Sequence, residues 1–210
     1  MSRTLLIALC LGLLAICGSR ARADVVVNGG FETETPAGCQ TAANPSLCNV
    51  PPSGWTITGD GVSIDTVFPN TGTYDIAFAT ASTDSNIGML SQSITTTVGQ
   101  NYTLTFFVMD EAANALDTLT VSYGGFTTTI TGDEAPATYT EESFTVPGAG
   151  AQNLVFEGIN DIAAWNLDDV SLNLISTGVP EPAGGVLLGT ALILWLGLVL
   201  PGRLRRPRPV

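Results

Sequence analysis

The chain has 210 residues, of which 19 are acidic, seven are basic and none is histidine, so its formal net charge is −12 at pH 7. All the basic residues are arginines near the two ends, and the intervening segment 24–182 carries all 19 acids and no Lys, Arg or His. No side-chain salt bridge can form inside this segment, so each carboxylate must be solvated, hydrogen-bonded or bound to a cation. Such a surface repels nucleic acid and anionic lipid and offers no cationic side chain to a phosphate ligand.

Residues 1–23 have the pattern of a secretory signal peptide. Arg3 is followed by an apolar run from Leu5 to Cys17, and Ala21-Arg22-Ala23 places small residues where signal peptidase requires them. We therefore predict cleavage by signal peptidase before Asp24, which removes two of the four cysteines.

The two remaining cysteines, Cys39 and Cys48, lie in a segment rich in Pro, Ala, Asn and Ser. In an oxidising compartment, a pair this close in sequence favours a disulfide. Zinc binding is the alternative, although two thiols without histidine supply only half of a usual zinc site.

Residues 24–176 are predicted to form one all-β domain. Short runs rich in Val, Ile, Thr, Phe and Tyr are separated by Gly, Pro, Asn and Asp, and no segment has a helical period. This number of short strands is typical of a two-sheet β-sandwich, for which we prefer a jelly roll. The predicted strands are Val25 to Val27, Trp55 to Thr58, Val62 to Phe68, Asp75 to Thr80, Met89 to Thr95, Tyr102 to Met109, Leu116 to Tyr123, Phe126 to Thr131, Thr138 to Val146, Gln152 to Glu157 and Asn166 to Ile175.

Two local patterns within this domain make sharper predictions. Gly124 and Gly125 join two predicted strands and tolerate the positive φ angles of a two-residue hairpin turn. In a strand, alternate side chains share a face, so Tyr102, Leu104 and Phe106 are predicted to point together into the core.

Acidic and aromatic residues near strand ends are the candidates for chemistry. The acid pairs Asp110-Glu111, Asp133-Glu134 and Glu141-Glu142 are predicted to be solvated surface, because neighbours in a strand point to opposite faces. Sugar binding requires flat aromatic faces beside polar groups, although the same residue types also fill the cores of sandwiches. The aromatic candidates for sugar binding are Tyr74, Tyr123, Tyr139 and Trp165.

Residues 177–210 have three parts in a characteristic order. Val179-Pro180-Glu181-Pro182 precedes an uncharged apolar block, 183–200, and an arginine cluster follows at 203–208. The block is long enough to form a transmembrane helix, and the arginines would hold the C-terminus in the cytoplasm. An ordinary single-pass anchor with a proline-rich stalk is the alternative interpretation.

This order resembles the PEP-CTERM sorting signal of Gram-negative bacteria. The resemblance implies that an exosortase removes the tail and exports the protein to the cell surface or the exopolysaccharide matrix. The precursor would be anchored in the membrane before processing.

A second resemblance covers nearly all of the predicted β domain. Val25-Val26-Val27-Asn28-Gly29-Gly30-Phe31-Glu32, Gly54-Trp55, the run from Gly99 to Phe106 and Trp165-Asn166-Leu167-Asp168-Asp169-Val170-Ser171-Leu172 are similar to landmarks of galactose-binding-like jelly rolls, a superfamily that includes many carbohydrate-binding modules.

The second resemblance implies a structural Ca²⁺ ion between the first and last segments of the domain. Glu32 and Asp168 would be the leading ligands, with Asp169 as an alternative and backbone carbonyls near Asn28 completing the oxygen shell. The alternative is that these carboxylates are exposed or hydrogen-bonded to loop backbone.

An enzyme is not expected, because a nucleophile in the exported segment would lack a histidine or lysine base. Two carboxyl groups can catalyse glycoside hydrolysis, but the spacing of the acids in the sequence does not indicate which two would form such a pair. The sequence predicts an exported, non-catalytic surface or matrix protein that binds or associates with extracellular polysaccharide. The alternative is a structural or adhesive display protein without a specific sugar site.

Overall fold

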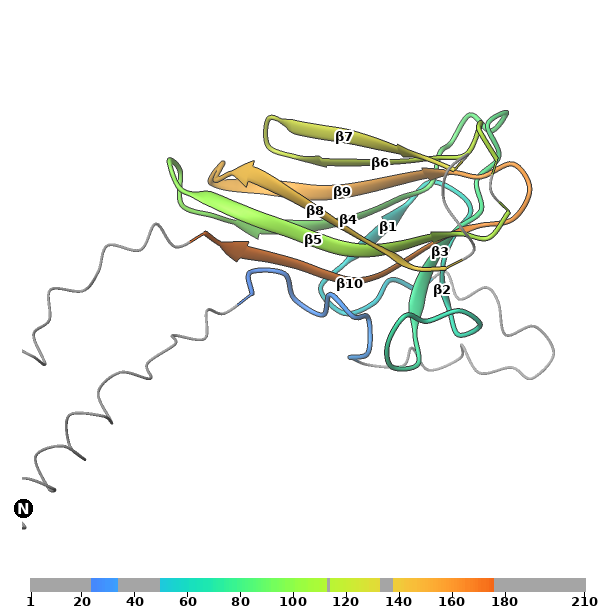
Figure 1. Ribbon diagram of the computed structural model, residues 1–210, viewed down its shortest axis with the longest axis horizontal. Helices are drawn as coiled ribbons and strands as arrows, with labels where there is room; N and C mark the ends of the chain where they lie inside the picture. The colour runs from blue at the N-terminus through green and yellow to red at the C-terminus, as the bar shows by residue number, and fades with distance from the viewer. Residues whose placement is uncertain (1–23, 34–49, 113, 133–137, 176–210) are drawn as a thin grey trace, which may run out of the picture. The chain divides into compact units, whose positions relative to one another are not determined.

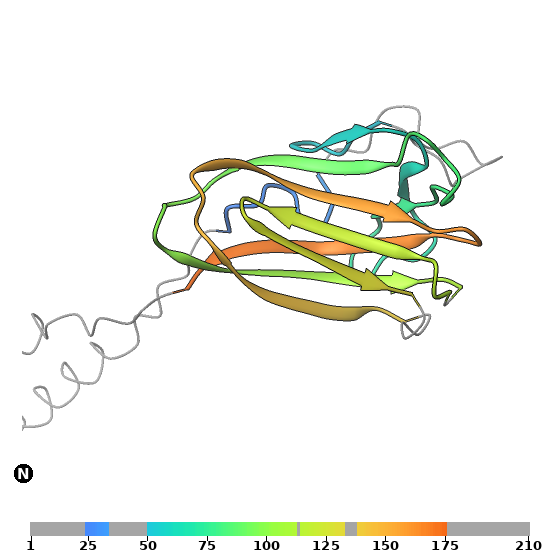
Figure 2. The same cartoon turned by 90° about the horizontal axis from the view of Figure 1, so that it is seen from above.

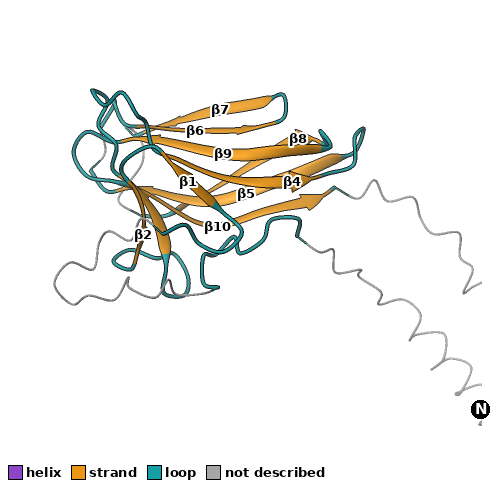
Figure 3. Ribbon diagram, turned by 180° about the vertical axis from the view of Figure 1, so that it is seen from behind, coloured by secondary structure: helices purple, strands orange, loops and turns teal. Residues whose placement is uncertain are grey.

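The computed structural model describes residues 24–33, 50–112, 114–132 and 138–175 (Figure 1). Within these ranges the chain forms strands and no helix (Figure 3). The strands are β1 (Thr56–Thr58), β2 (Val62–Asp65), β3 (Asp75–Phe78), β4 (Met89–Thr95), β5 (Asn101–Asp110), β6 (Thr118–Tyr123), β7 (Phe126–Thr131), β8 (Thr140–Pro147), β9 (Ala151–Ile159) and β10 (Trp165–Leu174).

Four predictions fall outside the described residues. They are the signal peptide, the pairing of Cys39 with Cys48, the acid pair Asp133-Glu134, and the tail with its sorting motif and apolar block. The described part of the chain contains no helix that is both long and apolar enough to cross a membrane.

The strands form two five-stranded antiparallel sheets, which confirms the predicted all-β class. One sheet has the order β1-β4-β9-β6-β7 and the other has the order β2-β3-β10-β5-β8. Figure 1 shows β7, β6 and β9 as one layer above β8, β5 and β10, and Figure 2 shows that these strands run in roughly similar directions. This is the arrangement of a β-sandwich whose twisted sheets pack face to face.

The core lies between the sheets and consists of alternate side chains from both. Tyr102, Leu104 and Phe106 are all buried in it, as predicted. Phe106 of β5 contacts Phe156 of β9 edge to face, with ring centroids 5.3 Å apart, so this pair links the two layers. Such aromatic pairs stabilise a core beyond the area that they bury.

Ten of the eleven predicted strands are present, and the missing one is Val25 to Val27. The main chain of Val27 bonds to the side-chain amide of Gln92 instead of to a neighbouring strand, with both contacts at 2.8 Å. The next residue, Asn28, has a φ angle of 53°, which ends any extended conformation. The side chain of Gln92 on β4 therefore makes the hydrogen bonds to Val27 that a neighbouring strand would make if Val25 to Val27 were a strand.

The first described segment lies against β10, next to a bulge in that strand (Figure 1). The register between β10 and β5 shifts between Asp168 and Ser171, and Asp169 has a φ angle of 51°. The bulge directs the N–H of Val170 to the carbonyl oxygen of Gly29 at 2.9 Å. A Cβ atom on Gly29 would collide with the carbonyl oxygen of Val170, so only glycine permits this approach.

The predicted hairpin between β6 and β7 is confirmed. Tyr123 pairs with Phe126 across the turn, and Gly124 has a φ angle of 56°. A Cβ atom on Gly125 would meet no neighbour within 4 Å. Of the two glycines, only Gly124 is required by its backbone conformation.

We expect Gly29→Ala to destabilise the domain by more than about 2 kcal/mol, because the added methyl group must push the first segment off the bulge of β10. Chemical denaturation of the purified chain measures this. Gly125→Ala is the matched control and should change the stability by less than about 0.5 kcal/mol. Equal stability of the two variants would contradict the close packing of Gly29.

Candidate functional site

The sheet β2-β3-β10-β5-β8 has an outer face that carries unusually polar buried side chains. In β10, Trp165 and Leu167 belong to the core, so Asn166 between them and Asp168 after them point to the other face. The same alternation places Asp75 of β3, before the core residue Ile76, on the outer face. Asn166, Asp168 and Asp75 are all fully buried.

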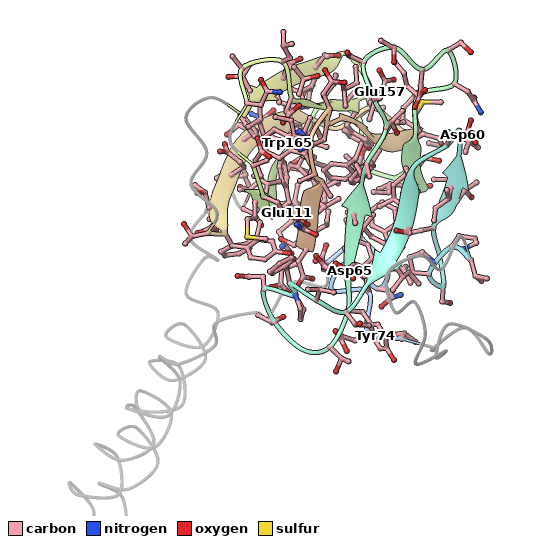
Figure 4. All side chains as sticks on the ribbon, turned by 90° about the vertical axis from the view of Figure 1, so that its right-hand side faces the viewer. Asp60, Asp65, Tyr74, Glu111, Glu157 and Trp165 are labelled. Carbon is pink, nitrogen blue, oxygen red and sulfur yellow. The ribbon has the colours of Figure 1, made fainter. Side chains whose placement is uncertain are left out.

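These residues belong to a group that we call the outer-face cluster. The cross-strand register pairs Asp65 with Asp75 and places Leu167 beside Ile76, so Asp168 follows next to Asp75. Figure 4 looks at the end of the sandwich where two members, Asp65 and Glu111, are labelled. The members of the outer-face cluster are Asp65, Asp75, Glu111, Tyr139, Asn166 and Asp168.

Asp75 is the most perturbed member of the cluster. Its Oδ2 atom accepts a hydrogen bond from the hydroxyl of Tyr139 at 2.9 Å, whereas its buried Oδ1 atom has no partner among the described residues. Burial raises the pKa of Asp75 from 3.8 to about 7; the Tyr139 hydrogen bond opposes this shift, and the charges of Asp65, Asp168 and Glu111 add to it. Asp75 therefore holds a proton near neutral pH.

Asn166 contributes a second unsatisfied acceptor. Its side-chain N–H donates to Glu111 Oε1 at 2.9 Å, but its buried Oδ1 atom has no partner in the described part of the chain. An unpaired buried acceptor costs about 1–3 kcal/mol, and a donor brought by water or by a ligand offsets this cost. The outer face thus holds two buried oxygens without a partner among the described residues: Asn166 Oδ1 is an acceptor, whereas Asp75 Oδ1 is a donor when the carboxyl is protonated and an acceptor when it is ionised.

The accessible part of the outer face lies on β8, β5 and β10. Phe107 of β5 is half-buried and pairs across the strands with Glu141, which is exposed. Thr105 and Ser171 share a hydrogen bond of 2.6 Å between their hydroxyl oxygens, and Asn173 donates to Ser171. We call this surface the polar strip; its members are Thr105, Phe107, Glu141, Ser143, Ser171 and Asn173.

The polar strip combines one aromatic ring with hydroxyl, amide and carboxylate groups. Tyr139 precedes β8 and adds a second half-buried ring, whose hydroxyl is held by Asp75. A ring face packs against the C–H groups of a sugar, while the surrounding polar groups exchange hydrogen bonds with its hydroxyls. The strip therefore offers the groups that carbohydrate recognition requires.

Two residues of the predicted calcium site, Asp168 and Asp169, hold the loop between β2 and β3. Asp168 Oδ2 accepts the N–H groups of Asn70 and Thr71, both at 3.0 Å, and its Oδ1 accepts the N–H of Asp169 at 2.7 Å. Asp169 accepts hydrogen bonds from the side chains of Asn70 and Thr71. Burial raises the pKa of Asp168 to about 6, although these N–H groups oppose the shift.

Glu32 and Asn28 lie against neighbouring backbone. Glu32 Oε1 accepts the N–H groups of Thr73 and Tyr74, so Glu32 holds the same loop as Asp168 and Asp169. The carbonyl oxygen of Asn28 accepts the indole N–H of Trp55 at 3.0 Å. No group of three or more His, Cys, Asp or Glu side chains is placed to hold a metal ion among the residues that the structure describes.

The four aromatic candidates have different environments. Tyr139 lies in the outer-face cluster, and Tyr74 is half-buried against the core. Tyr123 and Trp165 are fully buried between the sheets. The expectation for Tyr123 and Trp165 is therefore corrected: each ring fills the core and presents no face to a ligand.

Among the acid pairs, Asp110 was misjudged as solvated surface, because it is fully buried, and Glu111 and Glu142 are half-buried rather than exposed. Glu141 is exposed as predicted, and the pair Asp133-Glu134 lies outside the described residues. Sequence reasoning also missed Asp75 and Asn166. The available signal was a polar residue at alternate positions beside apolar residues of a predicted strand, and this signal does not show whether the polar side chain is buried.

Comparisons with known proteins show similarity in fold. No protein-family model matches the sequence, and no similar curated protein was found. The enzymatically active domain of tailspike protein 4 from bacteriophage CBA120 is similar over 72% of this chain, with a TM-score of 0.51 and 14% sequence identity. The match covers 21% of that tailspike chain, so the similarity concerns the fold of one part of it.

Carbohydrate-binding modules are also among the structural neighbours. TmCBM61, solved with β-1,4-galactotriose, is 19% identical with a TM-score of 0.48, covering 73% of this chain and 99% of that chain. The CBM22-1 xylan-binding domain from Paenibacillus barcinonensis is 16% identical with a TM-score of 0.47, covering 77% of this chain and 100% of that chain.

The raised pKa of Asp75 predicts a pH-dependent cost to stability. Between its ordinary value of 3.8 and about 7, the folded state holds a proton that the unfolded state releases, so this contribution makes stability fall as pH rises. Asp75→Asn should abolish the contribution, leaving stability near that of the natural chain at pH 4 and raising it by up to about 4 kcal/mol at pH 8. Denaturant titrations across this range measure the difference.

Asp84→Asn is the matched control, because Asp84 is an exposed carboxyl in the loop after β3. This control should follow the pH profile of the natural chain. If Asp75→Asn also followed the natural profile, Asp75 would not be protonated in the folded protein.

Proposed function

We propose that this protein is a non-catalytic, exported surface or matrix protein that binds extracellular polysaccharide through the outer face of the β2-β3-β10-β5-β8 sheet. The domain is proposed to be a jelly roll. The observation that carries the proposal is the polar strip, in which the half-buried ring of Phe107 lies beside the carboxylate of Glu141 and is followed along the sheet by hydroxyl and amide groups.

The outer-face cluster supports this function by fixing one edge of the strip. The hydroxyl of Tyr139 donates a hydrogen bond to Asp75, which fixes the orientation of the Tyr139 ring. Because the ring is already ordered, a ligand that binds it does not lose the conformational entropy of this side chain. Each hydroxyl group of a sugar contributes little to the free energy of binding. An aromatic surface that is formed before binding therefore favours the affinity for such a ligand.

Charge restricts the class of polysaccharide. The segment 24–182 carries 19 acids and no cationic side chain, so an anionic polymer would meet only repulsion unless divalent cations bridged the two. A neutral glycan instead donates its hydroxyl protons to carboxylate and carbonyl acceptors. We therefore propose a neutral, hydroxyl-rich polysaccharide as the ligand.

A structural Ca²⁺ ion is part of the proposal. Glu32, Asp168 and Asp169 all hold the loop between β2 and β3, which supports their assignment to one site. The second carboxylate oxygen of Glu32 and nearby carbonyls, including that of Asn28, would supply further hard oxygen ligands. In this role Ca²⁺ would stabilise the fold and take no part in chemistry.

Export and sorting are proposed from the sequence. Signal peptidase would cleave before Asp24, and an exosortase would process the tail at or near Val179-Pro180-Glu181-Pro182. The product would reside at the cell surface or in the exopolysaccharide matrix of a Gram-negative bacterium. This localisation would bring the polar strip into contact with the polymer that it is proposed to bind.

A catalytic role is disfavoured by the burial of Asp75 and Asp168, the carboxyls whose pKa values are raised to about 7 and about 6. Asp75 is fully buried, and its hydrogen-bonded oxygen is already occupied by Tyr139. A glycoside hydrolase requires such an acid within reach of the glycosidic oxygen. Binding without turnover is therefore the proposed activity.

We expect Phe107→Ala to weaken polysaccharide binding at least tenfold, about 1.4 kcal/mol, because it removes the aromatic ring of the strip. Affinity electrophoresis of the purified chain in gels containing neutral polysaccharides measures the loss. Thr127→Ala is the control, since Thr127 is exposed on β7 in the other sheet. Equal binding by both variants, or no retardation of the natural chain by any polysaccharide, would favour the display role.

A further inference from the structure

A second group of buried carboxylates lies at the end of the sandwich where β5 ends. Asp110 is the last residue of β5, Asp117 directly precedes β6, and Gly132 directly follows β7. The N–H of Gly132 donates to the carbonyl oxygen of Asp117 at 2.9 Å, and the side chain of Asn160, after β9, donates to Asp110. We call this group the end cluster; its members are Asp110, Asn114, Asp117, Gly132 and Asn160.

Each carboxylate of the end cluster is satisfied on one oxygen only. Asp110 Oδ1 accepts from the Asn160 side chain at 3.0 Å and from the N–H of Ala112 at 3.2 Å. Asp117 Oδ1 accepts from the N–H of Asp161 at 2.8 Å. The Oδ2 atoms of Asp110 and Asp117 have no partner among the described residues, although both side chains are fully buried.

Gly132 allows one of the free oxygens, Asp110 Oδ2, to pack closely against its backbone. A Cβ atom on Gly132 would collide with Asp110 Oδ2 and would lie 2.8 Å from the carbonyl oxygen of Asn114. The same point is 3.1 Å from the Cβ atom of Asp117. A free carboxylate oxygen of Asp110, the backbone carbonyl of Asn114 and the side chain of Asp117 therefore all lie close to Gly132.

We propose that the end cluster binds a divalent cation, with Ca²⁺ as the best fit, through Asp110 Oδ2, Asp117 Oδ2 and the carbonyl oxygen of Asn114. All three ligands are hard oxygens, and neither sulfur nor imidazole is present to favour a transition metal. Two buried carboxylates without a nearby cationic side chain are costly, and a cation converts this repulsion into attraction. Water completes the coordination shell.

This site is separate from the one proposed at Glu32, Asp168 and Asp169, and it has a different structural consequence. It joins the end of β5 in one sheet to the loop before β6 in the other sheet, so cation binding would tie the two layers together. Because it includes no residue of the polar strip, it goes beyond the proposed glycan binding and can be tested independently.

The test uses the purified full-length chain, freed of metal by a chelator and titrated with Ca²⁺ by calorimetry and by thermal unfolding. Asp117→Asn keeps the oxygen that accepts from Asp161 and removes the charge. We expect this variant to lose one Ca²⁺ site or to weaken it at least tenfold. In chelator it should be at least as stable as the natural chain, because one buried charge is gone.

Controls separate this site from the others. Glu157→Gln changes a carboxyl on the outer side of β9 and should leave Ca²⁺ binding unchanged. Glu32→Gln should affect only the other calcium site, so the two losses should add. Asp110→Asn repeats the test if Asp117→Asn does not fold. Unchanged Ca²⁺ stoichiometry and affinity in a folded end-cluster variant, or no Ca²⁺ binding by the natural chain, would overturn the proposal.

Discussion

The structure depends on satisfying carboxylates without any cationic side chain. In the segment 24–182, hydrogen-bond donors must come from backbone N–H groups, amides and hydroxyls, since no Lys, Arg or His is present. Asp168 and Glu32 show the result: each accepts two backbone N–H groups from the loop between β2 and β3. These hydrogen bonds from acidic side chains fix the loop between β2 and β3 to the segment 24–33 and to the bulge of β10. The few acceptors that this system leaves unpaired mark the places where something external should bind.

The polar side chains of the β2-β3-β10-β5-β8 sheet lie on its outer face because its inner face packs in the core. Each strand that contributes an apolar residue to the interior presents its alternate residues outward, so Asp75 and Asn166 meet on the face opposite Ile76 and Leu167. Burial raises the pKa of Asp75, and Asp75 accepts a hydrogen bond from the hydroxyl of Tyr139. The same sheet continues into the accessible strip around Phe107. A rigid, buried polar cluster beside an accessible aromatic strip is a physically reasonable basis for binding a hydroxylated polymer.

Much of the fold could be predicted from local patterns, whereas the site could be predicted only in part. Met89–Thr95 and Phe126–Thr131 were predicted with their observed bounds because alternation and turn residues are local signals. Val25 to Val27 failed because Gln92, 65 residues away, supplies the hydrogen bonds. Tyr123 and Trp165 were misjudged because spacing does not show which face of a sheet a strand turns inward. Asp110 was misjudged because the inward alternation of Leu104, Phe106 and Val108 continues to the last residue of β5, and we did not extend it to an acid. The predictions outside the described residues, including the sorting tail, stay predictions.

The most direct test of the proposed binding face is nuclear magnetic resonance mapping with an oligosaccharide of a polysaccharide that the chain retains. Backbone amide shifts should change along β5, β8 and β10, with the largest changes near Phe107 and Tyr139. Changes concentrated on β6 and β7 of the other sheet, or confined to the loop between β2 and β3, would contradict the proposal that this outer face binds glycan.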